Sequence, residues 1–269
     1  MTYFGFLLRF LVVPILILAG LVIWNQRRGR EQAATMRSVP VWLAIGIHML
    51  IALVYTTPWD NYLVATRVWW YDPALVSGLV IGWVPIEEYT FFVLQPILAG
   101  LWLVFLTQMM KIEAKPLRPA LRRWLPAAVG LVWLAALALL FGGARPATYT
   151  ALLLAWALPP IMLQLAFGAD ILWSYRQVVF LSIVPVTLYL VAADALAINF
   201  GTWTINPEQS FNIFLAGTLP IEEFFFFLLT NTLLTFGVLL LLSAASHQRL
   251  AEYRRWWQAR FSKGERVTM

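Results

Sequence analysis

The stretch Val84-Pro85-Ile86-Glu87-Glu88-Tyr89-Thr90-Phe91-Phe92 has a near copy later in the chain, Leu219-Pro220-Ile221-Glu222-Glu223-Phe224-Phe225-Phe226-Phe227. Each copy places a proline and two glutamates at the start of a long apolar run. Proline suits the first position of a helix, because the N–H that it lacks would have no partner there. The two copies therefore predict two equivalent helices that begin with paired carboxylates.

The similarity extends upstream of the two copies. Three residues match three others once a one-residue gap is allowed: Asp60, Trp69 and Pro73 correspond to Asp194, Trp203 and Pro207. The segment Val13-Pro14-Ile15 corresponds more loosely to Pro159-Pro160-Ile161. The sequence thus contains an internal repeat that covers most of the chain.

The composition around these motifs is that of a membrane protein. Of 269 residues, 61% are hydrophobic and 12% charged, and the mean hydropathy is +0.77. A soluble domain has about 25% charged residues. The chain has no cysteine, which excludes disulfides, thiolate nucleophiles, Cys-ligated zinc and iron–sulfur clusters, and its two histidines are too few for a His-based metal cage. We therefore expect no metal site.

Seven segments are long and apolar enough to cross a bilayer, which takes roughly 20 residues of helix. They lie near Tyr3–Trp24, Pro40–Thr56, Pro85–Leu106, Trp124–Phe141, Tyr149–Ala169, Val178–Ile198 and Leu219–Leu242. The first has no basic leader and is longer than the core of a signal peptide, so we expect it to remain as a spanning helix. The predicted fold class is an all-α integral membrane protein.

The basic residues predict the orientation. All of the 19 lysines and arginines except Arg9, Arg67 and Arg145 fall in the first, third and fifth connections and in the C-terminal tail. By the positive-inside rule, the N-terminus is outside and the C-terminus cytoplasmic. These clusters are typical of topology signals that contact anionic lipid, and we expect no nucleic-acid binding.

The repeat and the seven spans together predict a 3+1+3 architecture. We expect a first three-helix unit over 1–110, a basic loop and connector helix over 111–145, a second three-helix unit over 146–243 and a basic tail over 244–269. Both units then have the same orientation in the membrane, as in parallel repeats. Both glutamate pairs lie at the non-cytoplasmic side, in two equivalent sites or in one shared site.

The glutamates Glu87, Glu88, Glu222 and Glu223 are the candidate catalytic residues. An ionisable group within a membrane segment is costly and is a functional-site hypothesis by default. Negative side chains are also stabilised at a helix N-terminus, by about 0.3–1 kcal/mol. One acid would satisfy that structural role. Because adjacent helical residues point about 100° apart, we expect one glutamate of each pair to face the bundle and the other to meet a neighbouring helix or the outer connection.

Aromatic residues and two aspartates complete the candidate site. Phe91 and Phe92 follow Glu88 at helical spacing, and Phe226 and Phe227 follow Glu223, so these rings are candidate substrate-binding residues. Two of the four rings at 224–227 are expected to face lipid or neighbouring helices instead. Asp60 and Asp194 lie near the same side and are weaker candidates, since aspartates are common at helix ends. A further aromatic group is typical of an interfacial belt: Trp59, Trp69, Trp70, Tyr71 and Trp203.

The doubled Pro-x-Glu-Glu motif with its phenylalanines, Thr230-Asn231 after the second copy and Pro58-Trp59-Asp60-Asn61 upstream resemble the small membrane-embedded lycopene cyclases. Members of that family occur as heterodimers of two short subunits, as one fused chain, and as the cyclase half of fungal bifunctional phytoene synthase proteins. The resemblance covers nearly the whole chain, which would be the fused form. It implies an enzyme of carotenoid biosynthesis in the plasma membrane of a prokaryote.

The resemblance further implies that linear lycopene ends become β-ionone rings without net redox change. A carboxylic acid would protonate the terminal double bond, and a carboxylate would remove a ring proton after closure. Glu88 and Glu223 are the expected proton-handling acids, Glu87 and Glu222 their partners, and Asp60 and Asp194 weaker candidates. No G-x-G-x-x-G motif follows a strand, so no dinucleotide cofactor is expected. The expected partners are lycopene, the lipid bilayer and other enzymes of the carotenoid pathway.

Two other functions compete with this interpretation. A 3+1+3 repeat with intramembrane carboxylates also suits a proton-coupled transporter of small solutes, which would need a polar pathway through the bundle. A retinal-binding receptor would need a lysine within a helix, whereas Lys111, Lys115 and Lys263 lie in predicted loops or the tail. The carotenoid length (C40 or C50), the ring type (β, ε or γ), the number of ends closed and the number of active sites stay open, as does the oligomeric state.

Overall fold

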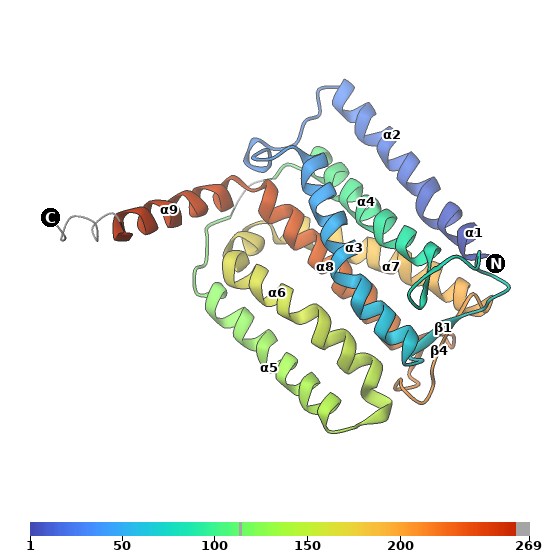
Figure 1. The fold of residues 1–269 in the computed structure, drawn as a ribbon. Coiled ribbons are helices and arrows are strands. Elements are labelled where there is room, and N and C mark those ends of the chain that lie inside the picture. The colour runs from blue at the N-terminus through green and yellow to red at the C-terminus, as the bar shows by residue number, and fades with distance from the viewer. Residues whose placement is uncertain (113–114, 262–269) are drawn as a thin grey trace.

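The computed structural model describes residues 1–112 and 115–261 and is mainly helical (Figure 1). Seven helices within these residues are long and apolar enough to span a membrane, which confirms the seven predicted segments. The first combines α1 (Tyr3–Leu7), the π-helical turn η1 (Leu8–Val12) and α2 (Val13–Arg27). The others are α3 (Val41–Ala65), α4 (Ile86–Met109), α5 (Leu121–Phe141), α6 (Thr148–Ser174), α7 (Arg176–Asn199) and α8 (Ile221–Leu242). Two short 3₁₀ turns, η2 (Ala34–Met36) and η3 (Arg145–Ala147), precede α3 and α6.

The helices form one bundle in which α4 and α8 are the most buried. Both begin at the end where the N-terminus lies, and α9 (Ala244–Phe261) leaves from the opposite end (Figure 1). Helix α5 packs along α6 and is the least buried of the seven, so most of its side chains face outward. The paired glutamates at the start of α4 and α8 therefore lie at one end of the bundle core.

Helices α3 and α7 extend beyond their central prolines. The sequence suggested an end near Thr56, but α3 continues through Pro58 to Ala65, and α7 similarly contains Pro185. Spanning helices tolerate an internal proline more readily than helices in water-soluble proteins do. The extension places Asp60 inside α3, as Asp194 is inside α7, and both side chains are buried.

The prediction of a purely helical fold is incomplete, because the connections before α4 and α8 contain short strands. A hairpin precedes each glutamate motif: β2 (Val80–Ile81) with β3 (Val84–Pro85), and β5 (Phe214–Leu215) with β6 (Leu219–Pro220). The first turn is Gly82-Trp83, whose glycine has φ +68° as a tight two-residue hairpin requires. The second turn has one residue more, 216–218, and this is the gap between the two repeats.

A third strand pair joins the two halves of the chain. β1 (Trp69–Tyr71) pairs antiparallel with β4 (Trp203–Ile205), with Trp70 opposite Thr204. The two strands are far apart in sequence, and each is too short for periodicity to reveal it. The pair lies at the end of the bundle where the N-terminus lies, near the start of α4 and α8 (Figure 1).

The polar residues in the middle of the bundle bind one another. Gln95 Nε2 donates to Asn231 Oδ1 at 2.7 Å, and Asn231 Nδ2 donates to Thr187 Oγ1 at 3.1 Å. This chain of hydrogen bonds links α4, α8 and α7. The same groups are among those that a transporter would need along an open polar pathway, and here they cross-link helices.

The Asn231→Leu substitution is expected to destabilise the bundle without changing its charge. It leaves the buried Gln95 amide without its acceptor, and such a loss inside a membrane protein costs about 0.6–2 kcal/mol. Unfolding of the detergent-solubilised protein with increasing sodium dodecyl sulfate measures the change. Thr232→Val is the control, because the Thr232 hydroxyl donates within its own helix, to the Leu228 carbonyl. Equal stability of Asn231→Leu and wild type would contradict the cross-linking role.

Part of the basic tail packs against the bundle. Its first part forms α9, and Arg249 is buried against α6, where its guanidinium binds both carboxylate oxygens of Asp170 at 2.9 and 2.6 Å. Arg249 Nη1 also donates to the Phe167 carbonyl at 2.5 Å. This arginine, counted among the basic residues of the tail, therefore also ties α9 to the bundle. The tail residues 262–269, with Lys263 and Arg266, lie outside the described residues.

Candidate active site

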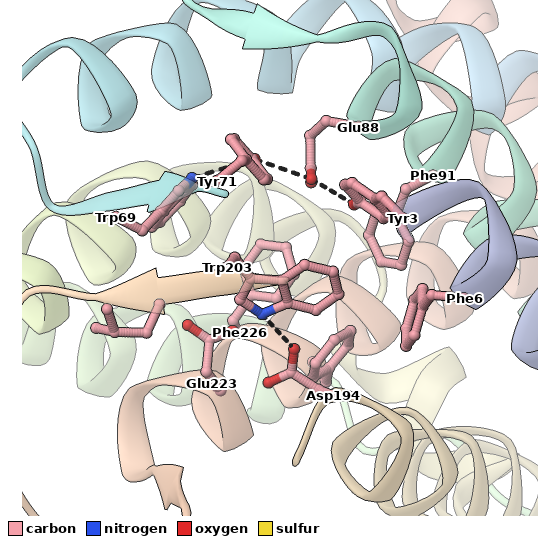
Figure 2. A pocket seen from close by; sticks show the side chains of 12 residues that line it. Tyr3, Phe6, Trp69, Tyr71, Glu88, Phe91, Asp194, Trp203, Glu223 and Phe226 are labelled. Carbon is pink, nitrogen blue, oxygen red and sulfur yellow. Dashed lines mark hydrogen bonds between the residues drawn. The ribbon is translucent and has the colours of Figure 1, made fainter. Parts of the chain in front are cut away.

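A small cavity lies beneath the β1–β4 pair, and we call it the acid cavity (Figure 2). Its volume is about 50 Å³, which is room for a few water molecules at about 10–15 Å³ each. Its lining comes from both halves of the chain: Tyr3, Phe6, Trp69, Tyr71, Glu88, Phe91, Asp194, Trp203, Ile205, Glu223, Phe226 and Phe227. Glu88 and Glu223, one from each half, thus line the same cavity.

Glu88 reaches the cavity from the first turn of α4 and accepts two phenol hydrogen bonds. Tyr3 Oη donates to Glu88 Oε2 from α1, and Tyr71 Oη donates to the same oxygen at 3.0 Å from β1. Trp69 Nε1 in turn donates to Tyr71 Oη at 3.2 Å. Burial raises the pKa of the Tyr71 phenol well above its ordinary value, and the carboxylates of Asp60 and Glu88 raise it further. Tyr71 therefore stays a donor near neutral pH and fixes the Glu88 carboxyl group.

Glu223 faces the same cavity from the first turn of α8. Tyr149 Oη donates to Glu223 Oε1 at 2.7 Å from the start of α6. In the view of Figure 2, Glu223 and Asp194 lie on the opposite side of the cavity from Glu88, with the Trp203 indole between them. Trp203 Nε1 donates to Asp194 Oδ1 at 3.0 Å, and Asp194 lines the cavity together with Glu223. Three carboxyl groups thus share one apolar chamber.

The other glutamate of each pair points away from the cavity. Glu87 Oε1 accepts the backbone N–H of Ser77 at 2.6 Å, and Glu222 Oε1 accepts that of Phe211 at 2.7 Å. Ser77 and Phe211 belong to the connections before α4 and α8. The division within each pair is the one expected from the 100° step, and it gives Glu87 and Glu222 a visible role in holding these connections.

The remaining predicted site residues divide between the acid cavity and its surroundings. Phe91, Phe226 and Phe227 line the cavity, whereas Phe92 lines a neighbouring groove. Phe225 is exposed on the bundle surface, as expected for part of the four-phenylalanine run. Asp60 does not line the cavity; it is buried beside Glu88, and neither of its carboxylate oxygens has a hydrogen-bond partner among the described residues.

The expectation of an interfacial belt is wrong for three aromatic residues. Trp69, Tyr71 and Trp203 line the acid cavity, because the β1–β4 pair folds them inward. Tyr3 and Tyr149 were not among the candidates at all. A signal for them exists: they stand at equivalent places in the first and fifth spans once Pro14 is aligned with Pro160. A phenol donor to a buried carboxylate is conspicuous only when the fold has brought the two together.

Sequence relatives match the parts of the chain that carry the acid cavity. A family model described as lycopene cyclase matches residues 2–106 and 146–241, which carry all the cavity residues and leave α5 unmatched. A lycopene beta-cyclase of Halobacterium salinarum is 41% identical over 190 residues, 66% of this chain and 73% of that protein. No solved structure matches the chain.

Fungal relatives match over the same part of the molecule. A bifunctional lycopene cyclase/phytoene synthase of Sporisorium reilianum is 37% identical over 184 residues, and one of Blakeslea trispora is 36% identical over 183. Each alignment covers 65% of this chain but only 27% and 30% of the longer fungal proteins. With the family model matched across both halves, the chain belongs to the lycopene cyclase family.

Proposed function

We propose that this chain converts the linear ends of lycopene into β-ionone rings. Its relative from Halobacterium salinarum is named a lycopene beta-cyclase. The observation that carries the proposal is the acid cavity, where Glu88 and Glu223 face one chamber walled by aromatic rings. Acids and aromatic faces are what a cyclisation through a carbocation needs. The relatives give no support to the alternative of a proton-coupled transporter.

The proposed reaction balances with one proton donated and one removed. A carboxylic acid protonates the terminal double bond of the linear end and leaves a tertiary carbocation. The electrons of a second double bond attack this cation, which closes the six-membered ring and moves the charge to a ring carbon. A carboxylate then takes a proton from the adjacent carbon, and that C–H electron pair becomes the ring double bond. The product is an isomer of the substrate, without net redox change.

Glu88 and Glu223 are the proposed proton donor and acceptor, since both face the cavity. The ring faces of Phe91, Phe226 and Trp203 would stabilise the cation between the two steps, as aromatic quadrupoles do for other cations. Asp194 lines the chamber and Asp60 lies behind Glu88, so both suit a supporting role through their charge. Glu87 and Glu222 would act indirectly, by holding the outer connections.

The proposal includes the 3+1+3 organisation, with units over 1–110 and 146–243 about the connector over 111–145. Equivalent hydrogen bonds support it: Tyr55 Oη donates to the Trp156 carbonyl at 2.8 Å, and Tyr189 Oη to the Phe10 carbonyl at 3.0 Å. The β1–β4 register is symmetric about the Trp70–Thr204 pair, as a twofold relation requires. We further propose that the acid cavity lies at the non-cytoplasmic side, because the basic connections and α9 lie at the other end.

Expression in bacteria that accumulate lycopene tests the activity. Chromatography of the extracted pigment should show that lycopene is replaced by products with one or two β-rings. Unchanged lycopene beside well-expressed, membrane-inserted protein would refute the proposal. A product with ε- or γ-rings would retain cyclisation but refute the position assigned to the final deprotonation.

The Tyr149→Phe variant tests whether the hydrogen bond from Tyr149 positions the Glu223 carboxyl group. Removing the hydroxyl leaves the ring in place and deletes one hydrogen bond to a carboxyl group, and such bonds contribute about 1.5–3 kcal/mol. The rate of cyclisation in isolated membranes should fall at least roughly tenfold. Tyr62→Phe is the control, because Tyr62 is exposed on the outside of α3 and should retain wild-type activity. A rate for Tyr149→Phe equal to that of Tyr62→Phe would contradict the positioning role.

A further inference from the structure

Two apolar grooves flank the bundle below the acid cavity. The first, of about 300 Å³, lies among α3, α4, α6 and α8, and we call it the Gln95 groove. The second, of about 330 Å³, lies among α2, α4 and α7, and we call it the Trp102 groove. Both volumes are those of small-molecule sites, which run from about 300 to 1,000 Å³.

Each groove is lined by helices of both halves, and the repeat relates the residues of one groove to those of the other. Tyr55 in the first corresponds to Tyr189 in the second, and Leu163 corresponds to Ile17. Each groove is open at the side of the bundle, since Leu163 is 72% and Ile17 59% exposed. In a spanning bundle this side faces the hydrocarbon of the bilayer, so an apolar molecule can enter either groove without crossing water.

Only one of the two grooves meets the acids. The Gln95 groove shares Phe91 and Phe226 with the acid cavity, and these rings stand between the two spaces. The lining of the Trp102 groove has no residue in common with the acid cavity. The repeat therefore provides two similar grooves, but the described residues connect one of them to the site.

We propose that the Gln95 groove holds the conjugated polyene chain of the substrate while its linear end passes between Phe91 and Phe226 to the acids. The inference rests on the proposed function. The acid cavity has room for only a few waters, so the rings must shift for the end to enter and the rest of the molecule must lie outside. The groove that continues the cavity, lined by Phe92 and Trp156 as well, offers flat ring faces to a flat chain.

Tryptophan substitutions at equivalent positions in the walls of the two grooves test the role of each groove separately. Ala52 lines the Gln95 groove and Val186 is its counterpart in the Trp102 groove, so Ala52→Trp and Val186→Trp place an indole in one groove each. Ala52→Trp should lower the rate of lycopene cyclisation at least about tenfold, whereas Val186→Trp should stay within about twofold of wild type. Leu163→Trp and Ile17→Trp form a second matched pair, should either variant fail to insert.

Binding gives a readout that does not depend on turnover. A protein carrying both Glu88→Gln and Glu223→Gln should retain lycopene through purification in detergent, and the absorption spectrum measures the bound pigment. Adding Ala52→Trp should release it, and adding Val186→Trp should not. The inference would be overturned if Ala52→Trp and Val186→Trp had equal effects, or if neither Ala52→Trp nor Leu163→Trp had any effect. In either case an active wild type would leave the proposed function intact. A wild type that leaves lycopene unchanged would instead refute the function itself.

Discussion

Replacing Glu88 or Glu223 by glutamine is expected to abolish ring formation while the protein still inserts and folds. Glutamine keeps the size and can accept the tyrosine hydrogen bonds, but it can neither donate nor take the proton of the reaction. General acid–base groups contribute about 10²–10⁴-fold in rate, so each variant should lose at least about 100-fold. Pigment chromatography after expression with lycopene measures the loss, and quantified membrane protein normalises it.

Glu87→Gln and Glu222→Gln are the matched controls, since each is adjacent in sequence and makes the same chemical change. Their glutamates bind backbone N–H groups of the connections, and a glutamine oxygen can accept the same bond. These variants should retain most of the activity and lose mainly stability. Full activity in both Glu88→Gln and Glu223→Gln would refute the assigned roles, and a loss in only one would show that the two acids are not equivalent.

Replacing Arg249 by alanine is expected to cause the largest loss of stability. The guanidinium side chain is 11% exposed and the Asp170 side chain 1%, so the variant leaves a buried carboxylate without its partner. Breaking a buried pair in this way costs about 3–5 kcal/mol. Thermal unfolding of the detergent-solubilised protein, followed by circular dichroism, should show a clearly lower midpoint.

Arg254→Ala removes the same charge from an exposed position of α9 and should leave the midpoint nearly unchanged. Asp170→Asn combined with Arg249→Met removes both charges and should recover part of the loss, because neither partner then stays unpaired. If Arg249→Ala and Arg254→Ala melt alike, the ion pair does not hold α9 to the bundle.

The helices and the paired acids could be predicted because their signals are local. A run of apolar residues crosses a bilayer whatever its neighbours are, and Glu88 and Glu223 are conspicuous because charge is otherwise scarce in such runs. Helix geometry also predicts that the two glutamates of a pair face different surroundings, but not which of them faces the bundle. These features need no knowledge of which segments touch.

The contacts between distant segments could not be predicted in the same way. Tyr3 meets Glu88, and Tyr149 meets Glu223, only because the first and fifth spans pack beside α4 and α8. Three-residue strands have no readable period, so the inward turn of Trp69 and Trp203 was invisible and an interfacial belt was the simpler interpretation. Arg249 likewise reads as a surface charge until α9 folds against α6.

The β1–β4 pair joins the two halves of the chain without using the connector between them. Every residue of the acid cavity lies before the end of α4 or after the start of α6, and the family match leaves out α5 between them. The contacts that join the two halves at the cavity are a backbone strand pair and helix packing, and none of the cavity residues lies in the connector. Two separate chains, one ending after α4 and one beginning before α6, are therefore expected to assemble the same cavity.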